Sequence, residues 1–156
     1  FGRFSLPQEW DWEACCRAGR DRADDHFGIP WKNTRGEEQF DSLSSREANF
    51  NGQYPYGDAP EGEDLNGTCP VGGIPGREYP ANGFGLVDMH GQVLEWQRNL
   101  SGTPEVEANH ERISNVCCVC WGDWVRIASR SRASNRNRSA AAIRSDDVGL
   151  RCVRTP

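Results

Sequence analysis

The chain has 156 residues, 36% of them hydrophobic, which suits one domain of ordinary size. No apolar run approaches the ~20 residues that span a bilayer, so the sequence predicts no transmembrane segment. The formal net charge is -5, yet residues 121–156 hold eight Arg against three Asp. Only one Lys accompanies 17 Arg in the chain, which favours arginines that pair with the acidic body over a nucleic-acid surface.

Seven cysteines are present, and only Cys117 and Cys120 have C-x-x-C spacing, with no second such pair in the chain, so a zinc site is not indicated. Neighbouring cysteines such as Cys15 and Cys16 rarely bond to each other. Small buried thiols are the favoured interpretation. One or two disulfides remain open if the protein is exported, and location at the cell surface or outside the cell would require a leader or anchor removed before Phe1.

A short helix is predicted over residues 7–18. Pro7 suits its first turn, Glu9 and Asp11 favour its N-terminal end, and Gly19 ends it. Residues 20–85 are rich in Gly, Pro, Asn and Asp and show no sustained period, so a long loop region is expected. Such a region needs something to order it in a compact domain.

Strand signals are confined to the second half of the chain. Residues 86–97 contain a short apolar run, and residues 113–121 and 148–153 are typical of strands. A polar loop is expected over 100–112, and a polar, arginine-containing stretch separates the last two strands. Neither a repeat nor a domain linker is visible.

Four motifs in order resemble the formylglycine-generating-enzyme family, a branch of the C-type-lectin fold. They are the helix LPQEWDWEACCRAG (6–19), the loop ANFNG (48–52), the signature NGFGLVDMHGQVLEW (82–96) and the closing strand VGLRC (148–152). The resemblance implies an α+β, C-type-lectin-like fold with a small mixed sheet, few helices and long irregular loops. It spans residues 1–156 as a single domain, and the strand–helix portion that precedes the first motif in the family has no counterpart in residues 1–5.

In this family calcium orders the long loops, and calcium takes oxygen ligands from carboxylates and carbonyls. At the first matching site the ligands would be Asp88, Gly91, Val93 and Glu95. At the second they would be Asn49, Phe50, Glu63 and Leu65, where Glu63 stands in place of the usual Asp and Asp64 adjoins it. Solvated acids that cap turns are the alternative. In either case the role would be structural, because these loops bury little apolar surface.

The enzymes of the family oxidise a substrate cysteine with copper held by two cysteines that precede the closing strand. No cysteine lies between Trp121 and Arg151 here, so no catalytic residue is predicted and the protein is expected not to be an enzyme. His26, His90 and His110 show no pairing suited to the non-haem iron of a related branch, and surface or loop positions are expected for them. A formylglycine-generating-type oxidase, or a divergent enzyme of the same fold, remains the alternative.

A further branch comprises the variable proteins of diversity-generating retroelements, whose C-terminal segment is rewritten at template adenines, mostly in Asn codons. Such rewriting cannot produce Trp, Lys, Met, Gln or Glu. Residues 125–156 contain none of these five, whereas residues 1–124 contain 25 of them. The resemblance therefore implies a non-enzymatic binding protein with a hypervariable surface at 121–147, for a protein or other macromolecule.

The matching scaffold arginines are Arg132, Arg136, Arg144 and Arg151, expected to pair with acids beneath the surface. Trp121, Ile127 and Ile143 would give apolar anchors. The full set of predicted contact residues is Trp121, Asp123, Val125, Ile127, Ser129, Ser131, Asn135, Asn137, Ser139, Ala140, Ala142, Ile143, Ser145 and Asp146. An ordinary polar loop without a ligand, and an accessory domain that binds an operon partner, are the other interpretations.

Overall fold

The structure is a computed structural model that describes residues 2–20, 25–29, 31–32, 35–39, 41–98, 118–120, 122–137, 139 and 143–155. The predicted loop at 100–112, most of the predicted strand at 113–121, and Trp121, Ala140 and Ala142 lie outside these residues. Within the described residues, no helix is long and apolar enough to cross a membrane.

The predicted N-terminal helix is confirmed as α1, Glu9–Arg17. Its N-cap is Gln8, so Pro7 precedes the first turn instead of entering it. Glu9 and Asp11 lie in that turn, where the helix dipole favours negative charge. The helix ends as Ala18 turns left-handed (φ 51°) and Gly19 follows at φ 75°.

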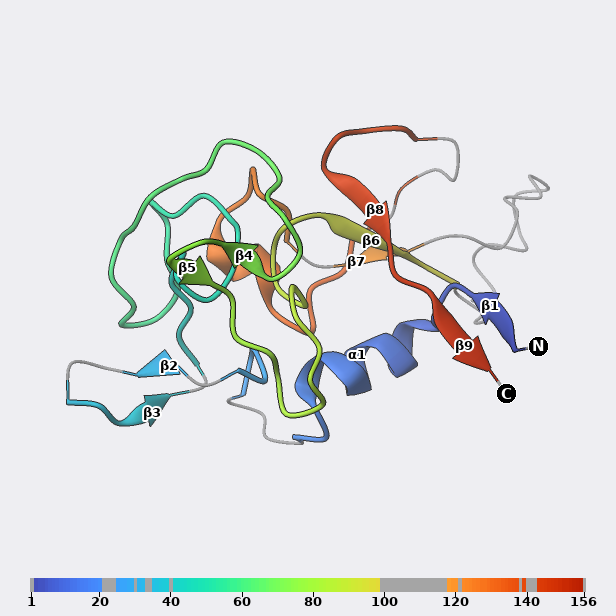
Figure 1. The fold of residues 1–156 in the computed structure, drawn as a ribbon, viewed down its shortest axis with the longest axis horizontal. Coiled ribbons are helices and arrows are strands. Elements are labelled where there is room, and N and C mark those ends of the chain that lie inside the picture. Colours follow the sequence, from blue (N-terminus) through green and yellow to red (C-terminus); the bar gives the residue numbers. More distant parts are fainter. Residues whose placement is uncertain are drawn as a thin grey trace, which may run out of the picture.

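A small mixed sheet forms the centre of the fold, as the family resemblance implies. β6 (Leu94–Gln97) lies between β7 (Cys118–Cys120), to which it runs antiparallel, and β8 (Val148–Leu150), to which it runs parallel. Figure 1 shows α1 below this sheet, with both chain ends beside it. A separate two-stranded pair, β1 (Arg3–Ser5) and β9 (Val153–Thr155), joins those ends.

The predicted strand at 148–153 is in fact two strands. β8 stops at Leu150 and β9 starts at Val153, and each pairs with a different partner. Arg151 lies between them and directs its guanidinium to Glu95 of β6. The chain therefore leaves the β6–β8 pairing at Arg151, whose side chain turns toward Glu95.

The long loop region is also as predicted, apart from two minimal hairpins: β2 (Trp31–Lys32) with β3 (Glu38–Gln39), and β4 (Gly73–Ile74) with β5 (Arg77–Glu78). Two apolar clusters hold the body together. One joins α1 to the signature loop through Trp12, Cys16, Met89 and Ala133. The other gathers the loops around Phe27, Ile29, Leu43, Ala48, Phe50 and Ala128.

Candidate functional site

The segment 122–137 follows β7 and is held on the body by its own buried residues. Ala128 and Ala133 are both fully buried, and each belongs to a different apolar cluster. The 3-10 helix η1, Ala128–Ser131, begins at the first of them. The Ala133 amide also donates to the His26 carbonyl at 2.9 Å. The backbone of the segment is therefore fixed at two points five residues apart.

Arg136 ties the segment to α1. Its guanidinium pairs with Glu9 and Glu13 one turn apart on the helix, and Nη1 donates to the carbonyl of Ala133 at 3.1 Å. Burial alone would raise the pKa of Glu13, but hydrogen bonds from Arg17 and Arg136 outweigh it, and the pKa of Glu13 is lowered. This scaffold arginine pairs with acids beneath it, as the sequence predicts.

Arg151 makes the second such pair, with Glu95. Its Nε and Nη2 approach the Glu95 carboxylate at 3.0 and 2.9 Å, and Trp12 Nε1 donates to the same carboxylate at 2.5 Å. Arg151 Nη2 also donates to the Val87 carbonyl at 3.1 Å. The signature loop is thus connected to β6 by a guanidinium.

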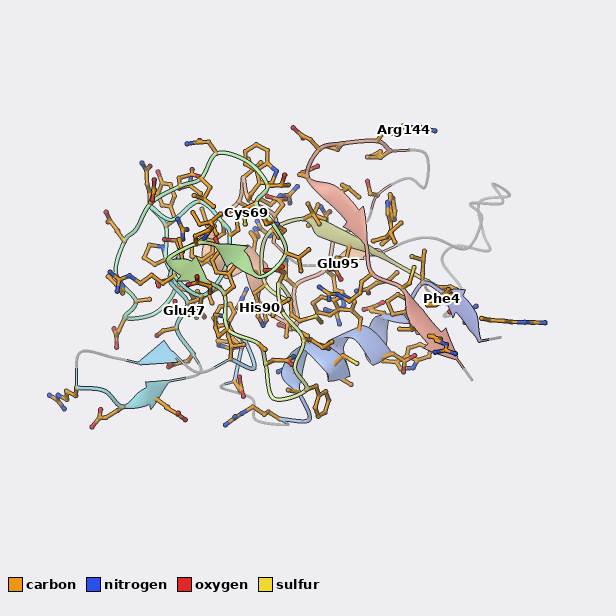
Figure 2. The ribbon with its side chains drawn as sticks, viewed as in Figure 1. Phe4, Glu47, Cys69, His90, Glu95 and Arg144 are labelled. Atoms are coloured by element: carbon orange, nitrogen blue, oxygen red, sulfur yellow. The ribbon has the colours of Figure 1, made fainter. Side chains whose placement is uncertain are left out.

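The other two scaffold arginines differ. Arg132 donates to the Ser129 carbonyl at 2.9 Å and lies 5.8 Å from the centre of the Tyr56 ring, so an aromatic face and not an acid receives it. Arg144 is exposed, and Figure 2 shows it on the outer chain that leads into β8.

Most of the predicted contact residues that the structure describes lie at the surface. Val125, Ile127 and Ile143 are 52%, 42% and 45% exposed. The remaining ones are exposed or half-buried, namely Ser129, Asn135, Asn137, Ser139, Ser145 and Asp146.

The prediction is wrong for Asp123 and Ser131, because both side chains are fully buried and cannot contact a ligand at the surface. Asp123 shapes the local turn, because its carboxylate accepts from the amides of Val125 and Arg126 at 3.0 and 2.9 Å. Burial raises the pKa of Asp123 despite the Arg126 charge nearby. Ser131 packs against Gly122, where a Cβ would come within 1.9 Å of the Ser131 Oγ.

The first predicted calcium set fits a cation only in part. Glu95 already has its carboxylate paired with Arg151 and Trp12. Asp88 keeps one oxygen, Oδ1, buried without a partner, while Oδ2 accepts from the Gly72 amide at 2.7 Å. Burial raises the pKa of Asp88. Gly91, whose carbonyl was predicted to bind, packs against the Asn49 backbone.

The second predicted set has one well-placed feature. Asn49 is buried, its amide nitrogen donates to Gly67 O and Gln92 Oε1 at 2.9 and 2.7 Å, and its Oδ1 has no partner. A buried amide oxygen of this kind suits a calcium ligand. Glu63, however, is exposed and lies 3.7 Å from Arg77 Nη1. Among the residues described, no three His, Cys, Asp or Glu side chains cluster to hold a metal.

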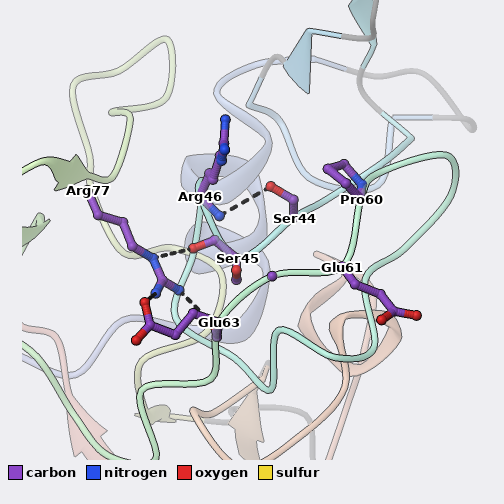
Figure 3. Close-up of a pocket in the computed structure, with 8 residues that line it drawn as sticks. Ser44, Ser45, Arg46, Pro60, Glu61, Glu63 and Arg77 are labelled. Carbon is purple, nitrogen blue, oxygen red and sulfur yellow. Dashed lines mark hydrogen bonds and ion pairs between the residues drawn. The ribbon is translucent and has the colours of Figure 1, made fainter.

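Glu63 and Arg77 also line a hollow of about 290 Å³ on the loop-rich half of the body. Figure 3 shows the Arg77 guanidinium between Ser45 and Glu63. Its Nε donates to the Ser45 carbonyl at 2.7 Å. The hollow carries both signs of charge, with Arg46 and Glu61 also in its wall.

His90 lies in a loop, as expected, and its side chain is buried there (Figure 2). Its Nε2 lies 3.4 Å from the Cys16 thiol, and its Nδ1 lies 2.7 Å from the Ser131 carbonyl. Burial raises the pKa of Cys16 and lowers the pKa of His90 to about 4. Both groups are therefore neutral at pH 7, which suits a packing contact and not a reactive thiolate.

Sequence patterns do not single out Tyr54, which lies beside the predicted surface. Its side chain is exposed, and its carbonyl accepts from the Ala128 amide at 3.1 Å. No motif marks it, because its position depends on a contact between loops more than 70 residues apart in the chain.

Comparisons with known proteins agree with this fold. The inactive C-alpha-formylglycine-generating enzyme 2 of Bos taurus is 28% identical over 150 residues, 95% of this chain and 43% of that protein. PvdO from Pseudomonas aeruginosa has a TM-score of 0.64 at 26% identity, covering 98% of this chain and 53% of that one. Treponema denticola variable protein 1 has a TM-score of 0.61 at 20% identity, covering 96% and 46%, and shows the shared fold alone.

This chain thus spans about half the length of each of these proteins. The family model of the sulfatase-modifying factor enzyme 1-like domain matches residues 1–156, and the chain belongs to that family.

Proposed function

We propose that this chain is a non-enzymatic ligand-binding protein of the variable-protein class, with a hypervariable surface at 121–147 on a fixed scaffold. The observation that supports this most directly is the difference in burial between neighbouring residues of the segment 122–137. Ala128 and Ala133 are fully buried and hold the backbone, while Val125 and Ile127, just before Ala128, are exposed. Exposed positions accept substitution at little cost to folding, so the side chains can change while the backbone stays.

The pairs that hold the scaffold support this proposal. Arg136 connects the segment to α1, and Arg151 connects the chain after β8 to β6. A rigid body that presents exchangeable side chains is the arrangement that recognition surfaces use. The fold shared with a protein named as variable, and the relative named as inactive, are consistent with a binding role.

The absence of the copper-binding cysteines is the main argument against the oxidase alternative. No cysteine lies between Trp121 and Arg151, and a thiolate pair is what holds Cu(I). Among the thiols whose side chains the structure describes, Cys16 is fully buried beside a neutral His90. Protein loaded with copper and offered a cysteine-containing peptide should therefore give no turnover. Turnover at a rate proportional to bound copper would establish the alternative.

Calcium is proposed as a structural ion of the loop region. The unpartnered oxygens of Asn49 and Asp88 are the features that suit it. Of the two predicted sets, the one around Asn49 and the Phe50 carbonyl fits better, because Glu95 of the other is paired with Arg151. When bound, the ion would cross-link loops that bury little apolar area.

Sequencing the gene in a population of the source cells tests the variable surface directly. We expect clones to differ at the codons for Val125 and Ile127, which are exposed, and for half-buried Asn135, and to agree at those for Ala128 and Ala133. A near-copy of this stretch with adenines at the differing codons, beside a reverse-transcriptase gene, should accompany it. A uniform sequence with no such copy would refute the proposal.

A further inference from the structure

Two loops from distant parts of the chain form one continuous surface. The amide of Asn51 donates to the Arg126 carbonyl at 3.0 Å, and the amide of Ala128 donates to the Tyr54 carbonyl at 3.1 Å. The turn 51–54 is closed by its own hydrogen bond, Tyr54 N to Asn51 O, at 3.0 Å. Tyr54 therefore lies next to Ile127, with the backbones of both loops fixed relative to each other.

The turn that carries Tyr54 is rigidly held on its inner side. Phe50 is fully buried in an apolar cluster. The Gly62 amide donates to the Gly52 carbonyl at 2.8 Å, and a Cβ on Gly52 would come within 2.4 Å of the Glu63 carbonyl oxygen. No side chain other than hydrogen fits there, so the turn stays against its neighbour.

Tyr54 is nevertheless 55% exposed, beside exposed Val125 and Ile127. An aromatic ring has few rotatable bonds, so fixing it on binding costs little entropy. Since Tyr54 precedes the segment proposed to vary, its side chain would be the same in every variant.

The exposed charge that residues 122–137 contribute beside this group is positive. Residues 122–137 contain four arginines and one acid, and that acid, Asp123, is buried and paired with Arg126. Arg130 is exposed and has no carboxylate partner among the residues described. A partner that places carboxylates around an apolar or aromatic group complements such a surface.

We propose that Tyr54 is a constant anchor of the binding surface, and that this surface takes acidic protein segments that contain aromatic residues. The inference rests on the proposed binding function and extends it to the partner class. Val125 and Ile127 adjust the fit around the ring, and Arg130 supplies the long-range attraction.

A random glutamate–tyrosine copolymer is a defined probe for this surface. Its binding to the intact chain is measured by biolayer interferometry at 50 and 500 mM salt, against a lysine–tyrosine copolymer. We expect binding of the acidic copolymer alone, weakened about tenfold or more at the higher salt. Tyr54→Ala should weaken it about fivefold or more, and Tyr54→Phe should keep most of it.

Matched controls come from exposed residues elsewhere. Phe84→Ala removes an aromatic side chain that is 58% exposed on another loop, and Arg154→Ala removes an exposed cation of β9. Both should bind like the unmodified chain, whereas Arg130→Ala should bind more weakly and lose part of the salt dependence. Unchanged melting temperatures show that each variant is folded.

Three results would overturn the inference: no binding of the acidic copolymer, equal binding of the basic one, or no effect of Tyr54→Ala. Other results distinguish a failure of the Tyr54 anchor from a failure of the proposed variable surface. If Ile127→Asp abolishes binding and Tyr54→Ala does not, the variable surface stands and the anchor fails. If the gene is uniform in the population but Tyr54→Ala weakens binding, the anchor stands and the variable class fails.

Discussion

Substitution at position 131 tests which side chains of the segment face solvent. Ser131 is fully buried, and Gly122 packs against it so closely that a Cβ there would reach its Oγ at 1.9 Å. Ser131→Tyr forces a ring into filled space, which costs about 3 kcal/mol if the neighbours yield in part. For a domain of this length each kcal/mol lowers Tm by roughly 2–4 °C, so Tm should fall by about 6–12 °C.

Ile127→Tyr is the matched control, because it introduces the same ring at an exposed position four residues earlier. Its free energy of unfolding should change by less than about 0.5 kcal/mol. Ser131→Ala separates volume from polarity: the Ser131 Oγ is buried without a partner, so its removal should leave Tm equal or higher. All three are measured by circular dichroism on heating.

Equal melting temperatures for Ser131→Tyr and Ile127→Tyr would show that residue 131 is at the surface. The conclusion that Ser131 does not contact a ligand would then be wrong.

Three further predictions concern what holds the body. Arg136→Ala should lower the free energy of unfolding by about 1–2 kcal/mol at pH 7, measured by urea titration. Because the pKa of Glu13 is lowered, this difference from the unmodified chain should shrink in titrations below pH 4.5, where Glu13 takes up a proton. The pKa of His90 is lowered from 6.5 to about 4, so the unfolded chain takes up a proton on this residue before the folded chain does. The free energy of unfolding should therefore fall by about 1 kcal/mol per pH unit between pH 6.5 and pH 4, and a His90→Gln variant should lack this slope. Calcium at 100 times its Kd should add about 2.7 kcal/mol to the free energy of unfolding and raise Tm. EGTA should reverse this rise, and magnesium should not reproduce it. Asn49→Ala should remove the calcium response, and a response that survives this substitution would place the ion elsewhere.

Local patterns were sufficient where the residues that decide a structure are close in sequence. The helix ends at Ala18 and Gly19 as its glycine predicts, and β6 and β8 lie within the apolar runs that indicated strands. That these strands share one mixed sheet was implied by the family resemblance and not by the local pattern. The break in that closing strand was not predictable from periodicity. It depends on Arg151 reaching Glu95, 56 residues earlier.

Site residues divide in the same way. The resemblance to the variable proteins indicated the exposed side chains, but it could not reveal that the Asp123 carboxylate accepts hydrogen bonds from its own turn or that Gly122 packs against Ser131. The partners of Arg136 lie more than 120 residues away on α1, so only their charge could be expected. Glu95 matched a calcium motif, yet an arginine from the same chain reaches it.

Ala128 and Ala133 give the outer face a thermodynamic link to the interior. Because each completes a different apolar cluster, the face cannot loosen without opening the body beneath it. Its conformation is already set before any encounter, so a partner has little ordering to do on association. By the same link, whatever binds this face will also raise the melting temperature of the whole domain.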